Sequence, residues 1–483
     1  LGVALATAGV RVLRALPAGG GAHIPRLDEV NVDARVLGVA AGIVVLAALG
    51  ISLIPALRSA SLALSALLGS AGRSLTAGRT QQRARQALVV SQLALTLALL
   101  SGAALMARSF LRLRAVQPGF DPAHALSFRV ALPKSAYPAP EDPARFVIRA
   151  LEAMSAVPGI SAAGAATKLP LTTEARQDTA VFVEGQPLPP GTMPALHQVV
   201  YASPGYFRAM GIPLLQGSTF QRPDPANAPR EVIVSRSVAE RYWKGQPVVG
   251  RRVRMNARGP WQTIVGVAGD VRGTALEAPP DETIYVPLVV ALGSDSTGAT
   301  RFTPRDIGFV ARSAQGAEVV AAAAERVVRA LDPSVPLYAV QPMADVVRRA
   351  EARTTFTLLL LGIASAVALA LGAVGTYGVI AYVVSLRQRE IAVRLALGAP
   401  PARVLRMVLL QALSLVVLGI VLGLAGAMGA TRVLAALLYG VSPTDAVALA
   451  GAALVLVAVG VAASWAPARH AARVDPGMVL RGE

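Results

Sequence analysis

Residues that could bind a nucleotide or perform catalysis are few and scattered in this chain. Its three lysines, Lys134, Lys168 and Lys244, do not follow a glycine, so the chain lacks the Gly-Lys-Ser/Thr ending of a phosphate-binding P-loop. The four histidines are far apart, and neither a His-Glu-x-x-His nor a Gly-x-Ser-x-Gly motif occurs. Without cysteine, thiol chemistry and Cys-ligated metals are excluded. We therefore expect no enzyme, with no catalytic, cofactor-binding or metal-binding residues.

One segment instead carries charges at a spacing that suits recognition. Residues 385–399 read Ser-Leu-Arg-Gln-Arg-Glu-Ile-Ala-Val-Arg-Leu-Ala-Leu-Gly-Ala, and we name this segment the elbow. We expect the apolar helix before it to continue into it. Gly398 fits the left-handed residue just past a helix end, and Pro401 fits the first turn of a following helix. The sequence thus predicts a helix, a sharp turn and a second helix.

The charges of the elbow fall on roughly one helix face. Arg387, Glu390, Arg394 and Leu397 are spaced i, i+3, i+7 and i+10, and Ile391 stands beside them. Two interpretations remain open on this pattern alone. The face is either a basic collar that fixes orientation and touches anionic lipid, or a docking knob for a cytoplasmic partner.

The composition indicates lipid-facing surface. The chain is 54% hydrophobic and only 15% charged, whereas soluble domains carry about a quarter charged residues. Its formal net charge of +18 is nearly all arginine. Many of these arginines flank apolar runs, where the positive-inside rule places them, so we do not expect a nucleic-acid partner.

Five stretches are long and apolar enough to cross about 30 Å of hydrocarbon, and a sixth is represented by its tail. The full stretches are Val36–Leu57, Ala87–Met106, Phe356–Val383, Met407–Met428 and Ala446–Trp465, and the tail is Leu1–Val10. None of the five contains Asp, Glu, Lys, Arg or His. Ion-coupled transporters usually carry such residues along their path, so that function class is disfavoured.

Arginine placement predicts the orientation of these spans. Three segments are strongly basic: residues 58–86, which lack acids, the elbow region after Val383, and the C-terminal tail. The positive-inside rule makes all three cytoplasmic. Residues 109–352 then form one large extracytoplasmic domain.

That domain mixes strand-like and helix-like runs. Residues 231–235 and 263–268 have strand patterns, and residues 143–154 and 317–331 have helix patterns. We therefore expect an α-helical membrane protein with a large mixed α/β extracytoplasmic domain. The domain's carboxylates, such as Asp270, Asp281 and Glu282, we interpret as solvated groups rather than a catalytic pair.

Small residues in the spans suit close helix packing. Gly38 and Gly42 form one small-xxx-small pair, and Gly419 and Gly423 form another. Packing within the chain is one interpretation, and a dimer seam is the other.

The two ends of the chain resemble each other. Asp33-Ala34 and Pro55-Ala56 near the start match Asp445-Ala446 and Pro467-Ala468 near the end, with the same separation from Asp to Pro. In each copy an outside turn precedes a span, which exits into a basic tail. We interpret this as an internal repeat whose first copy has lost its opening spans, and we therefore expect the chain to be N-terminally truncated.

Several motifs resemble those of a known family, the MacB/FtsX-like ABC transporter permeases, and specifically the duplicated orphan permeases. The elbow has the family pattern at Arg387, Arg389, Glu390, Ile391, Arg394, Ala396, Leu397, Gly398 and Ala399. The tail has it at Pro467, Ala468, Ala472, Asp475, Pro476, Leu480 and Arg481. Runs such as Ser203-Pro-Gly-Tyr-Phe207 extend the resemblance through the outer domain.

The resemblance implies a domain order and a docking site. It implies that residues 1–78 are the remnant of a first FtsX-like unit and residues 79–108 the first span of a second unit. Residues 109–352 would be a MacB-like core domain, and residues 353–483 an FtsX-like domain with three spans. It also implies that the elbow, through Arg387, Arg389, Glu390, Ile391, Arg394, Leu397 and Gly398, couples to a cytoplasmic ABC ATPase subunit.

The resulting functional hypothesis is a permease subunit in the bacterial inner membrane. A separate ATPase would bind the ATP, and its hydrolysis would move the outer domain to export or extract an envelope substrate. The second permease unit would lie in the same intact chain or in a homodimer. The alternative is a membrane-anchored sensor or scaffold that regulates an envelope protein without transport.

Overall fold

The structure is a computed structural model of the chain. It describes residues 33–49 except 43 and 47, and residues 74–473 except 140, 187–188, 190, 222–229, 258, 289, 296–297, 303 and 435–437. The described residues form two compact units. Arg114–Ala352 make up one of them, and the segments before and after it make up the other.

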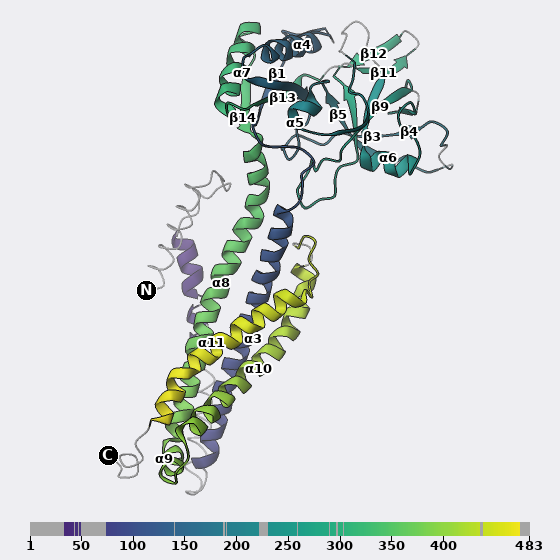
Figure 1. The fold of residues 1–483 in the computed structure, drawn as a ribbon. Coiled ribbons are helices and arrows are strands. Elements are labelled where there is room, and N and C mark those ends of the chain that lie inside the picture. The colour runs from purple at the N-terminus through teal and green to yellow at the C-terminus, as the bar shows by residue number, and fades with distance from the viewer. Residues whose placement is uncertain are drawn as a thin grey trace. The chain divides into compact units, whose positions relative to one another are not determined.

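Apolar helices dominate the membrane unit (Figure 1). Its elements, some of which begin or end in the other unit, are α3 (Ser74–Arg114), α8 (Met343–Leu386), α9 (Gln388–Ala396), α10 (Pro401–Leu434) and α11 (Ala446–Ala472). All of these except α9 contain a stretch long and apolar enough to cross a membrane.

Four of the five predicted spans therefore lie in such helices. The remaining one, Val36–Leu57, is represented by a shorter apolar helix over Ala34–Leu46. Most of its second half lies outside the described residues, as does Leu1–Val10. The observed architecture is thus four apolar helices and a mixed α/β unit, and the larger number of spans stays a prediction.

One of the predicted small-residue pairs packs within the chain. A Cβ added to Gly419 or Gly423 would lie 2.7 Å from Leu93 or 2.9 Å from Leu97, so α10 and α3 approach closely at these glycines. In addition, the Thr96 hydroxyl of α3 donates a hydrogen bond to the Ala368 carbonyl of α8 (3.2 Å). Packing within the chain is confirmed for this pair. Gly38 and Gly42, by contrast, have no described atom within 4 Å of an added Cβ.

The two aspartates of the internal repeat cap their helices in the same way. Asp33 Oδ1 accepts a hydrogen bond from the Val36 amide (2.8 Å), and Asp445 Oδ1 accepts one from the Ala448 amide (2.9 Å). Each satisfies an amide that has no partner in the first helical turn. The match extends the sequence similarity to local geometry.

The second unit is a mixed α/β structure (Figure 1). Its helices are α4 (Asp142–Ser155), α5 (Tyr206–Met210), α6 (Arg236–Trp243) and α7 (Ala317–Leu331). Its strands are β1 (Ala125–Ala131), β2 (Ile160–Ala166), β3 (Asp178–Ala180), β4 (Phe182–Val183), β5 (Leu196–Ala202), β6 (Leu214–Gly217), β7 (Glu231–Ser235), β8 (Arg252–Arg254), β9 (Gln262–Ala268), β10 (Thr283–Pro287), β11 (Val290–Asp295), β12 (Gly298–Phe302), β13 (Asp306–Ser313) and β14 (Leu337–Pro342). The predicted strands and helices of this domain are confirmed.

One mixed sheet organises the unit. Its strand order is β14-β1-β13-β2-β5-β10-β7-β9-β8-β4, with β3 and β6 paired to β5 and β9. The first four strands are antiparallel and pair over several residues each. Phe128 of β1 stacks on its cross-strand partner Phe309 of β13, with 5.1 Å between the ring centroids. Between β2 and β5, in contrast, the ladder has a single rung, Ala166 opposite Ala202. The hydroxyls of Thr167 and Ser203 extend this short joint, since they accept hydrogen bonds from the Tyr201 and Ala165 amides (3.1 and 2.9 Å).

Helices pack on both faces of the sheet, and alternate residues of its strands point into two different hydrophobic cores. On β2, Ala163 and Ala165 belong to the core that includes α4 and α7, whereas Ala162 and Ala166 belong to the core that includes α5. Gly164 lets α5 approach the strand, since a Cβ there would lie 2.5 Å from the backbone nitrogen of Tyr206.

Replacement of Gly164 by Ala should destabilise this unit. Overpacking against a backbone atom costs about 1–3 kcal/mol. We expect a clearly lower Tm for Gly164→Ala, measured on the purified chain by intrinsic tryptophan fluorescence. Ser161→Ala, at an exposed position of the same strand, is the control and should change Tm little. An unchanged Tm for Gly164→Ala would contradict the close packing of α5 on β2.

His197 should make the stability of this unit depend on pH. Its side chain is fully buried, with Nε2 2.7 Å from the Tyr242 hydroxyl and Nδ1 3.0 Å from Glu282 Oε2. Burial lowers its pKa, an effect that Arg241 and Arg176 reinforce and Glu282 opposes. Below an ordinary pKa of about 6.5, the unfolded chain thus binds a proton that the folded chain excludes.

Stability should therefore fall as the pH drops below about 6.5, towards the lowered pKa of the folded state. The measurement is the difference in Tm between about pH 7.5 and about pH 5.5, on either side of that value. In His197→Gln the difference should shrink, because the titrating group is gone. A difference of equal size in both proteins would show that His197 does not titrate with unfolding.

Candidate functional site

The elbow is a separate short helix between two apolar helices. α8 ends at Leu386, Arg387 leaves the helical conformation, and α9 begins at Gln388. The helix of the preceding span continues past Val383 into the elbow as expected, and it is interrupted at Arg387. Local hydrogen bonds bridge this break, since the Arg387 amide bonds to the Val384 carbonyl (3.1 Å) and the Ile391 amide to the Arg387 carbonyl (2.9 Å).

The turn after α9 has the predicted chemistry. Gly398 adopts φ +87°, in the left-handed region that glycine enters without a steric cost. Around it, the Gly398 amide donates to the Leu395 carbonyl (3.0 Å) and the Ala399 amide to the Arg394 carbonyl (3.0 Å). α10 then begins at Pro401. The helix, sharp turn and second helix predicted from the sequence are confirmed.

One side of α9 is anchored in the membrane unit. Ile391 is 1% exposed and Ala392 is completely buried, and Ile391 packs in one cluster with Val384, Val404 and Val408. These neighbours come from the helices before and after the elbow. Full burial of such a side chain stabilises by about 1.5–3 kcal/mol. The buried side therefore holds α9 in a defined position.

The other side of α9 and its turn is exposed. Arg387, Glu390 and Arg394 are exposed, and Leu397 at the turn is 82% exposed. The Arg394 guanidinium lies 2.5 Å from Glu390 Oε1 and also donates to Met407 Sδ (3.0 Å). The exposed surface thus combines an ordered ion pair with a protruding aliphatic side chain, and we name it the elbow ridge.

The predicted site residues accordingly divide into two sets. Arg387, Glu390, Arg394 and Leu397 lie on the ridge, Ile391 lies in its base, Gly398 makes the turn, and Arg389 belongs to α9. Sequence reasoning missed Val393, which is 44% exposed on the same helix. Its spacing of one helical turn from Leu397 was the available signal.

The carboxylates interpreted as solvated take part in structural contacts. Asp270 accepts hydrogen bonds from the amide and hydroxyl of Ser237 (2.8 and 2.9 Å). Asp281 pairs with Arg176 (2.7 Å), and Glu282 pairs with Arg241 (2.5 Å). Within the described ranges, no group of three or more His, Asp or Glu side chains is placed to hold a metal ion.

Two family models match this chain, and one of the matches includes the elbow. Residues 35–330, more than half of the chain, match the model of the MacB-like periplasmic core domain. The chain belongs to this family. Residues 362–476 match the FtsX-like permease C-terminal model, which includes the elbow. The permease is accordingly a multi-pass inner-membrane protein with an extracytoplasmic segment.

Curated relatives match part of the permease. One is the pyoverdine export ATP-binding/permease protein PvdT of Pseudomonas savastanoi pv. phaseolicola, 30% identical over 56% of this chain and 40% of its own. Another is the macrolide export ATP-binding/permease protein MacB of Azoarcus sp., 27% identical over 58% of this chain and 41% of its own. The permease thus spans about two-fifths of the length of these relatives.

A solved structure also aligns with the permease. The periplasmic region of MacB from Actinobacillus actinomycetemcomitans aligns with 48% of this chain and 94% of its own, at 13% identity and a TM-score of 0.31. Similarity at that level supports no inference about fold or function.

Because the permease contains no cysteine, introduced cysteines can test on which side the elbow ridge lies. Leu397→Cys should react with a membrane-impermeant maleimide in inverted vesicles and stay unlabelled in spheroplasts. Met193→Cys, at an 84% exposed position of the α/β unit, should show the reverse pattern. Labelling of both cysteines from the same side would contradict the orientation.

Proposed function

We propose that the permease is the transmembrane subunit of an ABC transporter that exports or extracts an envelope substrate. In this proposal a separate cytoplasmic ATPase binds and hydrolyses ATP, and the permease relays the resulting movement to its extracytoplasmic domain. The observation that carries the proposal is the elbow ridge, whose base is buried and whose charged and apolar side chains are exposed. A bare basic collar would not require the ordered Glu390–Arg394 pair beside an exposed Leu397.

The helix that precedes the elbow supplies a route for the movement. α8 is 44 residues long, which corresponds to about 66 Å of helix. It begins directly after β14, the edge strand of the α/β sheet, and ends at Leu386, one residue before Arg387 and α9. In the proposal, α8 is the segment that links the elbow to the α/β unit along the chain.

The uncharged spans support mechanical coupling rather than passage of a solute between the helices. Transport pathways through a bundle usually contain ionisable residues, and the five predicted spans lack them. The names of the relatives describe export of pyoverdine and of macrolides by ATP-binding/permease proteins. Export driven by an ATPase is therefore the activity that we propose for this permease, with the ATPase on another polypeptide.

A tandem arrangement of two permease units is part of the proposal. The matching caps at Asp33 and Asp445 support residues 1–78 as part of a first unit and residues 353–483 as part of a second. A complete first unit in the intact chain would provide a second elbow beside the one at residues 385–399. The second unit would otherwise come from a homodimer.

Charge reversal on the elbow ridge should release the ATPase. Co-expression with the candidate ATPase, affinity purification of the permease and quantification of the recovered ATPase provide the measurement. Glu390→Arg and Arg394→Glu should each lower recovery about tenfold or more, since loss of one partner of an interfacial charge pair costs 2–5 kcal/mol. Arg469→Glu, another reversal at an exposed arginine that follows a span, should leave recovery unchanged.

The double variant separates recognition from helix stability. Glu390→Arg combined with Arg394→Glu keeps an ion pair within α9 but exchanges the positions of its charges. We expect it to release the ATPase as the single variants do, because the partner recognises each charge in its place. Full recovery in the double variant, or undiminished recovery in both single variants, would contradict docking at the ridge. ATP-dependent flux or substrate extraction by the reconstituted complex then distinguishes a transporter from a sensor or scaffold.

A further inference from the structure

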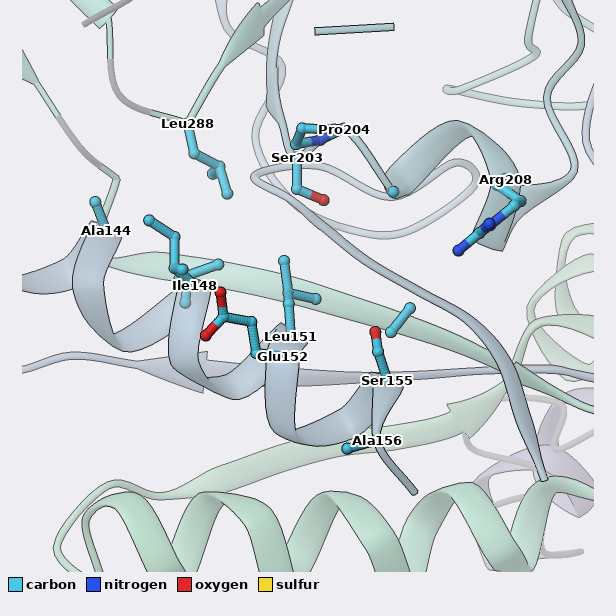
Figure 2. A pocket seen from close by; sticks show the side chains of 13 residues that line it. Ala144, Ile148, Leu151, Glu152, Ser155, Ala156, Ser203, Pro204, Arg208 and Leu288 are labelled. Carbon is cyan, nitrogen blue, oxygen red and sulfur yellow. The ribbon is translucent and has the colours of Figure 1, made fainter. Parts of the chain in front are cut away.

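A cleft in the α/β unit offers a site that the proposed function does not use. It has a volume of about 600 Å³ and lies between α4 and the segment from Ser203 to Arg208. Figure 2 shows Ile148, Leu151, Glu152 and Ser155 of α4 facing this segment and Leu288. The volume lies within the range of small-molecule sites, about 300–1,000 Å³.

The floor of the cleft is apolar and needs no polar ligand group. Val147, Ala163 and Leu288 lie there and are 0%, 7% and 3% exposed. The buried hydroxyl of Ser203 already accepts a hydrogen bond from the Ala165 amide (2.9 Å). The side walls continue this surface with Ile148 and Leu151, which are partly buried. An apolar group therefore fits the floor without leaving a buried polar atom unpaired.

The rim of the cleft is polar and carries a cation that is available to a ligand. Glu152, Ser155 and Arg208 are exposed there. Figure 2 shows Arg208 towards the Ser155 side and the Glu152 carboxylate towards the Ile148 side. Glu152 takes part in an interaction, whereas no hydrogen bond or ion pair of the Arg208 guanidinium is found among the residues the structure describes. The rim thus favours an anion at its Arg208 end and disfavours one at its Glu152 end.

We propose that this cleft binds a single-chain amphiphile with one anionic head group. Its apolar chain would lie against Val147, Leu151 and Leu288, and its head group would accept hydrogen bonds from Arg208. The cleft is walled by α4, by Ala163 of β2, by the Ser203–Arg208 segment, whose helix α5 packs on β2, and by Leu288. The proposal goes beyond coupling to an ATPase and holds whether or not the amphiphile is the exported substrate.

Photolabelling of the full chain in nanodiscs tests the proposal. The probes are a medium-chain fatty acid carrying a diazirine, the corresponding uncharged alcohol, and a lysophospholipid whose acyl chain carries the same diazirine. Mass spectrometry then identifies the labelled residues. We expect saturable labelling of α4 and of the segment around Leu288 by the acid, and about tenfold weaker labelling by the alcohol, because a charge-assisted hydrogen bond is lost.

Three variants separate the head-group site from the apolar site. Arg208→Gln should weaken labelling by the acid about tenfold and leave labelling by the alcohol unchanged. Leu151→Trp should fill the cleft and reduce labelling by both. Arg149→Gln removes an exposed arginine from the same helix but outside the cleft, so it should change neither. Circular dichroism confirms that each variant is folded.

Labelling by the lysophospholipid probe shows whether the anionic head group is a phosphate or a carboxylate. Saturable labelling by the lysophospholipid that depends on Arg208 assigns a phosphate head group, and labelling by the acid alone assigns a carboxylate. Equal labelling by acid and alcohol with no effect of Arg208→Gln would overturn the proposal. Labelling of the cleft that persists in Leu151→Trp, or absent labelling with every probe, would overturn it as well.

Discussion

The hydrocarbon of the bilayer imposes the constraint on which the rest of the permease depends. Inside it, backbone polar groups must pair within their own helix, and a lone charge is costly. The described spans accordingly consist of uncharged helices, and their ion pairs and cation contacts lie near the helix ends. Arg108 pairs with the capping Asp445 near one end of α3, and Arg85 lies 4.2 Å from the ring centroid of Tyr382 near the other. Because of this constraint, the spans carry few groups that could bind a polar partner. In our proposal such groups lie in the segments that connect the spans.

The elbow shows how such a connecting segment becomes a defined surface. Ile391 and Ala392 fix α9 among apolar residues of the neighbouring helices, while Gly398 reverses the chain within a few residues. The same nine-residue helix thus has a buried base and an exposed ridge. In the α/β unit, an apolar cleft lies between α4 and the segment from Ser203 to Arg208. In both proposals the binding surface is formed where side chains from several elements meet.

Local and compositional features of this structure were predictable, and long-range ones were not. The absence of charge in Phe356–Val383 predicted a span, and the glycine and prolines at residues 398–401 predicted the turn, because each rests on neighbouring residues. The interruption at Arg387 was not predicted because the residues on both sides of it are compatible with a continuous helix. The packing of Gly164 against Tyr206 and the pairing of Asp281 with Arg176 join distant segments, so no spacing in the sequence indicates them. The strand order likewise depends on tertiary contacts.

The single rung between Ala166 and Ala202 has a consequence for how the sheet is completed. Its two backbone bonds run from the Thr167 amide to the Tyr201 carbonyl and from the Ser203 amide to the Ala165 carbonyl. The amides of Tyr201 and Ala165 are bonded by the Thr167 and Ser203 hydroxyls instead of by carbonyls (3.1 and 2.9 Å). Two short hydroxyl side chains thus replace backbone partners where the ladder stops. Few residue types can stand at these two positions, because a buried amide without a partner is costly.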